Sequence, residues 1–289
     1  MKILAIGDFH GKFPQKLKDE AKKVDLIISV GDFGGVKEWY VYLKYIFRQT
    51  AKDKPYKSVK EFFGKERYRV IDKKDERVTK EILRSLNSFG KPVIFVFGNT
   101  DDNWYNYSFD RQAWKVKKSR VNFVRKLKNL KEITYSKTSL KGINLVGFGG
   151  YMDVDSYVDE RARSKDSPEA IGGRILRRAR SKRKLFSLIK GKAKKRIMIF
   201  HYPPKGYFDM IRMKGNVRNG TSAGINFFLE AITKSKPSLV LCGHMHEYQG
   251  MKRIGKSVLI NPGPAGEGKA AIIDYDESVA RVKKVKFLR

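Results

Sequence analysis

The sequence predicts an α/β fold, and two observations support that class. Five short apolar runs, rich in β-branched residues, recur along the chain, as is typical of strands buried on both faces. Segments between the runs place apolar residues three and four positions apart, which indicates amphipathic helices. The runs occupy residues 3–6, 26–30, 93–97, 197–200 and 239–242. Because they extend over most of the chain, we expect residues 1–289 to form a single domain.

Each run is followed within two residues by a side chain that can bind a metal ion. Open α/β sheets place their sites beyond the carboxyl ends of the strands, so we expect these side chains to share one rim. A glycine directly precedes four of them and would let the chain turn sharply there. The side chains are Asp8, Asp32, Asn99, His201 and His244.

Helices are expected between the first three runs. Residues 13–23 follow the first ligand loop and are mostly polar and charged, as expected of a surface helix. Apolar spacing predicts an amphipathic helix over 36–50 and another that ends near Phe89. The middle of this stretch, 51–71, is rich in lysine and is expected to be exposed. Residues 36–90 are therefore predicted to form a lysine-rich helical excursion.

A second basic segment lies further along the chain. Residues 174–196 contain twelve Lys or Arg and no acidic residue. We expect a basic helical segment over about 165–195, which is either a surface helix with a solvated basic face or a patch that tracks phosphates. One helical face would carry the apolar residues Ile175, Ala179, Phe186 and Ile189.

Further strands are predicted over residues 133–149 and near the C-terminus. Residues 250–257 match the letters of a phosphate-binding P-loop. A true P-loop follows a strand and opens a helix. Here residues 258–260 continue as an apolar strand, so the match is interpreted as a hairpin turn.

Histidine is scarce, and every copy lies in a motif of metal-ligand type. The chain has four histidines in 289 residues. Because histidine is the commonest metal ligand, we expect these four to serve one purpose. A ligand set of nitrogen and oxygen, which does not need the lone cysteine, favours Mn, Fe or Zn over thiolate chemistry. The histidines are His10, His201, His244 and His246.

The order of these motifs resembles the calcineurin-like metallophosphoesterase superfamily, from residue 1 to about residue 275. The resemblance implies two packed mixed β-sheets flanked by helices, and hydrolysis of phosphoester bonds by a pair of divalent metal ions. The motifs are Asp8-Phe9-His10, Gly31-Asp32-Phe33-Gly34-Gly35, Gly98-Asn99-Thr100-Asp101, His201-Tyr202-Pro203-Pro204 and Gly243-His244-Met245-His246.

The resemblance also implies a role for each ligand. One ion is assigned to Asp8, His10, Asp32 and His246. The other is assigned to Asp32, Asn99, His201 and His244, so that Asp32 would bridge. The implied catalytic residues are Asp32, Asn99 and His201, and the implied substrate contacts are Asn99, His201 and Thr100. Two such ions can activate a water and clamp both the attacking and the leaving oxygen of an in-line displacement.

Position 100 departs from the pattern of the superfamily, most of which has a histidine where this chain has Thr100. That histidine is thought to protonate the leaving oxygen, whereas a threonine hydroxyl does not ionise near neutral pH. The departure concerns the leaving group and not metal binding, and it disfavours unactivated phosphate monoesters as substrates. We therefore expect a phosphodiesterase, similar to smaller members that also lack the histidine. Asp101 is interpreted as a residue that caps the loop or supports a ligand.

The chain is strongly basic, with a net charge of +33 from 63 Lys and Arg against 30 Asp and Glu. Such an excess attracts polyanions and raises their encounter rate. A nucleic acid is therefore an expected partner beside the phosphoester substrate. A general habit of a lysine-rich organism, or retention near abundant RNA, explains the charge equally well.

The sequence also predicts a compartment. No run approaches the ~18 apolar residues of a membrane span, and the first strand begins too early to leave room for a signal peptide. Cys242, the lone cysteine, is expected in the core. These features predict a cytoplasmic protein without disulfides.

Two rival functions remain open at this point. A nuclease of the DNA-repair type shares the motifs, but it normally keeps the histidine that is Thr100 here. A non-catalytic nucleic-acid-binding or scaffold protein would be expected to lose ligands, whereas this chain retains all seven.

Overall fold

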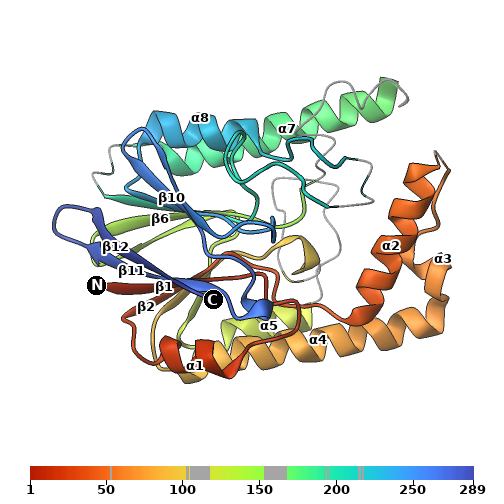
Figure 1. Ribbon diagram of the computed structural model, residues 1–289, viewed down its shortest axis with the longest axis horizontal. Helices are drawn as coiled ribbons and strands as arrows, with labels where there is room; N and C mark the ends of the chain where they lie inside the picture. The colour runs from red at the N-terminus through yellow and green to blue at the C-terminus, as the bar shows by residue number, and fades with distance from the viewer. Residues whose placement is uncertain are drawn as a thin grey trace.

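The computed structural model of the chain contains two six-stranded mixed sheets with helices on their outer faces (Figure 1). It confirms the predicted α/β class with two packed mixed sheets. The structure describes residues 1–52, 54–101, 104, 118–152, 168–191, 193, 195–213, 216 and 218–289.

The first sheet combines the N-terminal strands with two strands from the C-terminus, in the order β12-β11-β1-β2-β3-β4. Strands β1 to β4 are parallel, whereas β11 pairs antiparallel with both β1 and β12. The strands are β1 Lys2–Ile6, β2 Leu26–Ser29, β3 Val93–Phe95, β4 Leu130–Glu132, β11 Ala270–Asp276 and β12 Arg281–Leu288.

The second sheet has the order β5-β6-β7-β8-β10-β9. Its four inner strands are parallel, and both edge strands pair antiparallel with their neighbours. The strands are β5 Lys137–Leu140, β6 Ile143–Phe148, β7 Arg196–Phe200, β8 Leu239–Leu241, β9 Gly250–Ile254 and β10 Ser257–Asn261. The antiparallel pairing of β9 with β10 confirms the hairpin and excludes a P-loop.

The core has two layers because strand side chains alternate between faces. Ile3 and Ala5 of β1 belong to a buried cluster that also contains Ile197 of the second sheet. Their neighbours Leu4 and Ile6 belong to the cluster that includes the helices. Both faces of β1 are therefore buried, which explains why the strand appears in the sequence as an unbroken apolar run.

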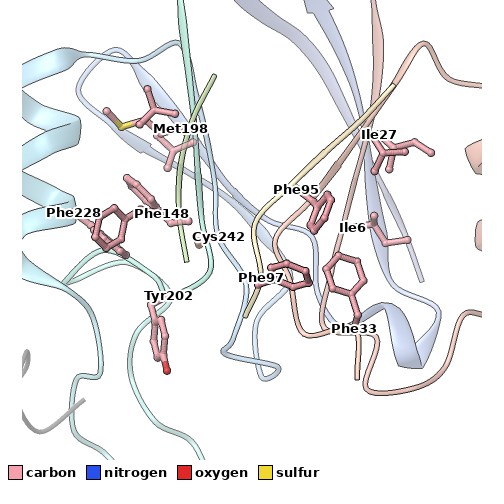
Figure 2. Close-up of a cluster of buried hydrophobic side chains, with 14 of the residues drawn as sticks. Ile6, Ile27, Phe33, Phe95, Phe97, Phe148, Met198, Tyr202, Phe228 and Cys242 are labelled. Atoms are coloured by element: carbon pink, nitrogen blue, oxygen red, sulfur yellow. The ribbon is translucent and has the colours of Figure 1, made fainter. Parts of the chain in front are cut away.

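Aromatic side chains fill the space between each sheet and its helices. Phe33 lies 5.3 Å from Phe95, which lies 5.1 Å from Phe97, measured between ring centroids. On the second sheet, Phe148 lies 5.7 Å from Phe228. Figure 2 shows these rings in two groups, one on the helix-facing side of each sheet. Because Phe33 and Phe97 lie in or beside the loops at the rim, their packing helps to fix those loops.

Helices cover the outer faces of both sheets (Figure 1). Helices α1, α4 and α5 lie on the side of the first sheet, and α7 and α8 on the side of the second. Two short 3-10 helices, η1 and η3, follow β3 and β10. The bounds are α1 Gln15–Ala21, α4 Lys65–Ser88, α5 Lys118–Arg125, α7 Pro168–Ile189, α8 Asn226–Ser235, η1 Asn99–Asp101 and η3 Ala265–Glu267.

The lysine-rich excursion, residues 36–90, comprises α2 Lys37–Ala51, α3 Val59–Phe63 and α4, which joins the core through Ile82, Leu83 and Leu86. The predicted amphipathic helix is confirmed as α2. This helix, which is described in full, contributes no buried residue, and α2 and α3 stand away from the sheets (Figure 1). The apolar face of α2 packs locally instead, since Tyr45 stacks on Phe62 of α3 at 4.5 Å.

Helix α7, Pro168–Ile189, lies within the predicted basic segment, but two of the four residues predicted for its apolar face are exposed. Ile175 is 49% exposed and Ala179 is also exposed, whereas Ile189 is buried. The buried Leu185 joins Ile189 in the core cluster. Because α7 extends past α8 (Figure 1), only its second half reaches the core. Among the described residues, no helix is both long and apolar enough to cross a membrane.

Candidate metal centre

The seven predicted ligands come together at the carboxyl ends of five strands. The first sheet supplies Asp8 after β1, Asp32 after β2 and Asn99 after β3. The second sheet supplies the three histidines that follow β7 and β8, and His10 completes the set. The candidate centre therefore lies where the rims of the two sheets meet.

The first ligand cluster contains Asp8, His10 and His246, whose potential ligand atoms all lie within 4.8 Å of one another. His10 Nε2 lies 2.9 Å from His246 Nε2, and His246 Nε2 lies 3.8 Å from Asp8 Oδ1. The backbone N–H of His244 donates to both oxygens of Asp8 at 3.1 Å. The Asp8 carboxylate is thereby oriented by the opposite loop.

The second ligand cluster contains Asp32, His201 and His244, again within 4.8 Å. Asn99 joins it, because its Oδ1 lies 2.8 Å from both His201 Nε2 and His244 Nδ1. His201 Nδ1 lies 2.8 Å from the carbonyl oxygen of Val30 and must carry the proton of that hydrogen bond. In the neutral ring, Nε2 then presents its lone pair to the oxygen of Asn99. A cation can bind between two lone pairs that face one another at this distance.

Asp32, a member of the second cluster, also faces the first. Its Oδ2 lies 3.6 Å from His10 Nε2 and 3.5 Å from His201 Nε2. Its Oδ1 accepts the backbone N–H of Thr100 at 2.9 Å. One oxygen is therefore held by the protein, while the other faces a nitrogen of each cluster.

The protonation states of the histidines suit metal binding. Burial lowers the pKa of His10, lowers that of His244 well below its usual range, and lowers that of His246 to about 4. These three imidazoles are therefore neutral at physiological pH, which is the form that binds metal ions.

The two carboxylates differ from one another. Burial raises the pKa of Asp8, and the neighbouring charge of Asp32 raises it further. Burial also acts to raise the pKa of Asp32, but the surrounding histidines, with His201 foremost, bring it down to about 2. Two buried carboxylates so close together repel one another, and a divalent cation between them relieves that repulsion.

The backbone is strained at four of the ligands. Asp8, His10, Asp32 and His244 have φ angles of 52°, 43°, 55° and 67°. This left-handed region is uncommon for residues other than glycine, and such residues gather at functional sites.

Of the glycines that precede the ligands, Gly31 has the predicted turning role, whereas Gly98 and Gly243 have another. Gly31 has a φ of 101° and does turn the chain. At Gly98 and Gly243 the reason is close approach, because an added Cβ would lie 2.1 Å from Asp32 Oδ1 or 2.6 Å from Asp8 Oδ2.

Asp101 joins two of the ligand loops. Its fully buried carboxylate accepts backbone N–H groups from both loops at 2.9–3.3 Å. The structure thus agrees with the interpretation of Asp101 as a supporting residue. The four donors belong to Asp32, Phe33, Gly34 and Gly98.

Thr100 is half-buried, and its hydroxyl lies 3.5 Å from the carbonyl oxygen of Gly34. The structure also places a residue at the centre that sequence reasoning missed. The ring of Tyr40, from α2, lies 6.2 Å from the ring of His10. No motif marks Tyr40 in the sequence, because it lies in the excursion and not after a strand.

The fold and the paired His/Asp clusters define a metallophosphoesterase. The chain matches the metallophosphoesterases of the calcineurin superfamily over residues 1–285 and belongs to that family. An uncharacterised protein of Methanocaldococcus jannaschii is 22% identical over 273 residues, which cover 91% of this chain and 88% of the relative.

Solved structures share the fold. One crystal structure, 19% identical, aligns with a TM-score of 0.64 over 99% of this chain and 97% of its own. The phosphopantetheinyl hydrolase of Mycobacterium tuberculosis, 15% identical, aligns with a TM-score of 0.51 over 92% of this chain and 90% of its own.

Proposed function

We propose that this chain is a dinuclear metal-dependent phosphodiesterase. The observation that carries the proposal is the position of Asp32 Oδ2, at 3.6 Å from a nitrogen of the first cluster and 3.5 Å from a nitrogen of the second. A single oxygen that faces both clusters is what a bridge between two ions requires.

The donor set indicates how the ions would be held. Asp8, His10, Asp32 and His246 would hold one ion, and Asp32, Asn99, His201 and His244 the other. When bound, the ions supply a nucleophilic water at neutral pH and neutralise charge on the phosphoryl oxygens. Nitrogen and oxygen donors suit Mn, Fe or Zn, and manganese is the first ion to test.

The side chains themselves orient the substrate. Because Asn99 Oδ1 points between His201 and His244, the amide protons of Asn99 are left to face a phosphate oxygen. His201 is held by the Val30 carbonyl, so its position does not depend on the substrate. These contacts make Asn99 and His201 the residues that we expect to place the phosphate.

The restriction to diesters follows from Thr100. Its hydroxyl is not an acid near neutral pH, so a poor leaving group receives no proton from this position. General acid assistance is typically worth about 10²–10⁴-fold in rate. Unactivated monoesters should therefore be slow substrates.

A substrate panel tests the proposal. Phosphomonoesters, linear and cyclic phosphodiesters, dinucleotides and a phosphopantetheinyl diester are each assayed with Mn, beside the Asp32→Asn protein as an inactive control. We expect metal-dependent hydrolysis of at least one diester class and slower hydrolysis of alkyl monoesters. Faster turnover of monoesters than of all diesters would contradict the assignment.

A nuclease is the second candidate, and the basic helix α7 favours it. Residues 174–184 of this helix carry seven Lys or Arg and no acidic residue, and α7 extends past α8 (Figure 1). A cationic surface of this kind can bind the backbone of a nucleic acid. A non-catalytic binding protein would use the same surface without hydrolysis.

A variant of α7 separates these roles. For a single strand, log affinity falls with log salt at a slope of about −0.7 per phosphate contact. Replacing Arg177, Arg178, Arg180 and Lys184 with Gln should therefore make this slope shallower by up to about 3. Hydrolysis of a small diester should be unchanged. Binding of oligonucleotides with the parent affinity and slope would show that α7 is only a solvated face.

A further inference from the structure

Tyr40 borders the metal centre from the helical excursion. Its ring lies 6.2 Å from the ring of His10, at an interplanar angle of 59°. It is 49% exposed, so it faces both a ligand and the solvent from which a substrate arrives. Tyr202 also lies beside a ligand, at 4.1 Å from His244, but it is only 1% exposed. Of these two tyrosines, only Tyr40 can meet a substrate.

The position of Tyr40 is fixed by its neighbour in the sequence. Trp39 Nε1 donates to Asp75 Oδ1 of α4 at 3.1 Å. Asp75 lies directly against the loop that follows Asp32, because an added Cβ at Gly34 would lie 2.8 Å from Asp75 Oδ2. The start of α2 is therefore tied to a ligand loop, and Tyr40 is held in place before any substrate binds.

The hydroxyl of Tyr40 can donate a hydrogen bond. A tyrosine phenol has an ordinary pKa of about 10 and therefore keeps its proton at physiological pH.

The reaction needs a donor that Thr100 does not supply. Hydrolysis develops negative charge on the departing ester oxygen, and a preorganised donor at that oxygen lowers the barrier. The hydroxyl of Thr100 faces the Gly34 carbonyl, and its N–H is used by Asp32.

Resting on the proposed phosphodiesterase activity, we propose that Tyr40 donates a hydrogen bond to the departing ester oxygen and so determines which leaving groups are accepted. In this step the oxygen of a water bonds to phosphorus. The bond from phosphorus to the ester oxygen breaks, and its electron pair stays on that oxygen. The departing oxygen receives the proton that the water gives up, through solvent. Tyr40 stabilises the negative charge that develops on the departing oxygen and keeps its own proton.

A series of methyl aryl phosphodiesters, whose phenols differ in acidity, tests this role. Tyr40→Phe removes the hydroxyl and keeps the ring. We expect kcat to fall about 10–100-fold for the least acidic phenol, as for a hydrogen bond to a charged group, with little change for the most acidic phenol. KM should change little. A plot of log kcat against the pKa of the leaving group should become steeper.

Tyr56→Phe is the matched control, because Tyr56 lies in the same excursion and is 55% exposed. It should leave the plot unchanged. Metal content and thermal unfolding of both variants should equal those of the parent. A uniform loss of rate across the series, no loss at all, or loss of metal from the Tyr40→Phe protein would each overturn the proposal.

The two proposals fail in different ways. A parent enzyme that hydrolyses none of these diesters contradicts the proposed function and the role of Tyr40 together. An active parent with an unchanged plot for Tyr40→Phe overturns the role of Tyr40 alone.

Discussion

The ligand loops, residues 7–11, 31–35, 98–101, 201–204 and 243–246, and the helical excursion, residues 36–90, are built in different ways. Three of the ligands are buried and the other four are half-buried, and four ligands have left-handed backbone. The helix α2 of the excursion has no buried residue along its described length. The loops are held by both sheets, whereas α2 and α3 are held by one another and by the start of α4.

This difference separates chemistry from selectivity. The loops have little freedom, because glycines allow backbone to lie against carboxylates and Asp101 accepts N–H groups from two loops. The excursion reaches the centre through Tyr40 and is tied to it through Trp39 and Asp75. We therefore expect changes in the loops to abolish metal binding, and changes in the excursion to alter substrate choice or local stability.

The largest effect is expected at Asp32. Asp32→Asn removes the negative charge that faces both clusters while the size of the side chain is kept. Because altered supporting residues already cost about 10–100-fold in metal affinity, we expect a loss of more than about 100-fold at both sites and nearly complete loss of activity. His10→Ala should leave the second site partly filled. Metal analysis after dialysis checks this, and two ions per chain in the Asp32→Asn protein would contradict the bridge.

Asp101→Asn tests the support of the loops. An amide would turn an NH₂ group toward two backbone N–H donors, which then lose their acceptor at a cost of about 1–3 kcal/mol. We expect metal affinity to fall about 10–100-fold, with a Tm several degrees lower. Asp19→Asn on the surface of α1 is the matched control. Unchanged metal affinity in the Asp101→Asn protein would show that the loops do not depend on this carboxylate.

Asp75 tests the link between the two regions. Burial raises the pKa of Asp75 to about 6 from a usual value of 3.8. The folded protein therefore holds a proton that the unfolded chain releases between about pH 4 and pH 6, so stability from this group is full at low pH and is lost as pH rises through 6. Asp75→Asn should remove about 2–3 kcal/mol of this dependence and raise Tm at pH 7 but not at pH 4. If the unfolding free energies of parent and variant change with pH in the same way, the raised pKa of Asp75 is contradicted.

The smallest global effect is expected at Phe62. Phe62→Ala removes the ring that stacks on Tyr45. We expect faster amide hydrogen exchange in α2 and α3, since local contacts hold them, with metal content unchanged. The amides of the ligand loops serve as the internal control. Equal acceleration in the loops would show that the two regions are not separate in stability.

Much of the fold could be predicted because local patterns coincide with buried elements. The apolar runs that precede Asp8, Asp32 and His201 all form strands, and the spacing in 36–50 gives the helix α2. The apolar pattern of α7 was misleading. The spacing of residues such as Ile175 predicts a helical face, but it does not show whether another element packs against that face. Coverage depends on where α8 ends, which no local pattern contains.

By itself, the sequence determined which residues can bind metal, because few residue types have the necessary lone pairs and they follow buried strands. Only the tertiary structure decided that one oxygen of Asp32 faces both clusters, that Gly98 and Gly243 are required by close approach, and that Tyr40 borders His10. These are distances between residues far apart in the chain. They follow from how two sheets and an excursion pack, and packing is a property of the whole molecule.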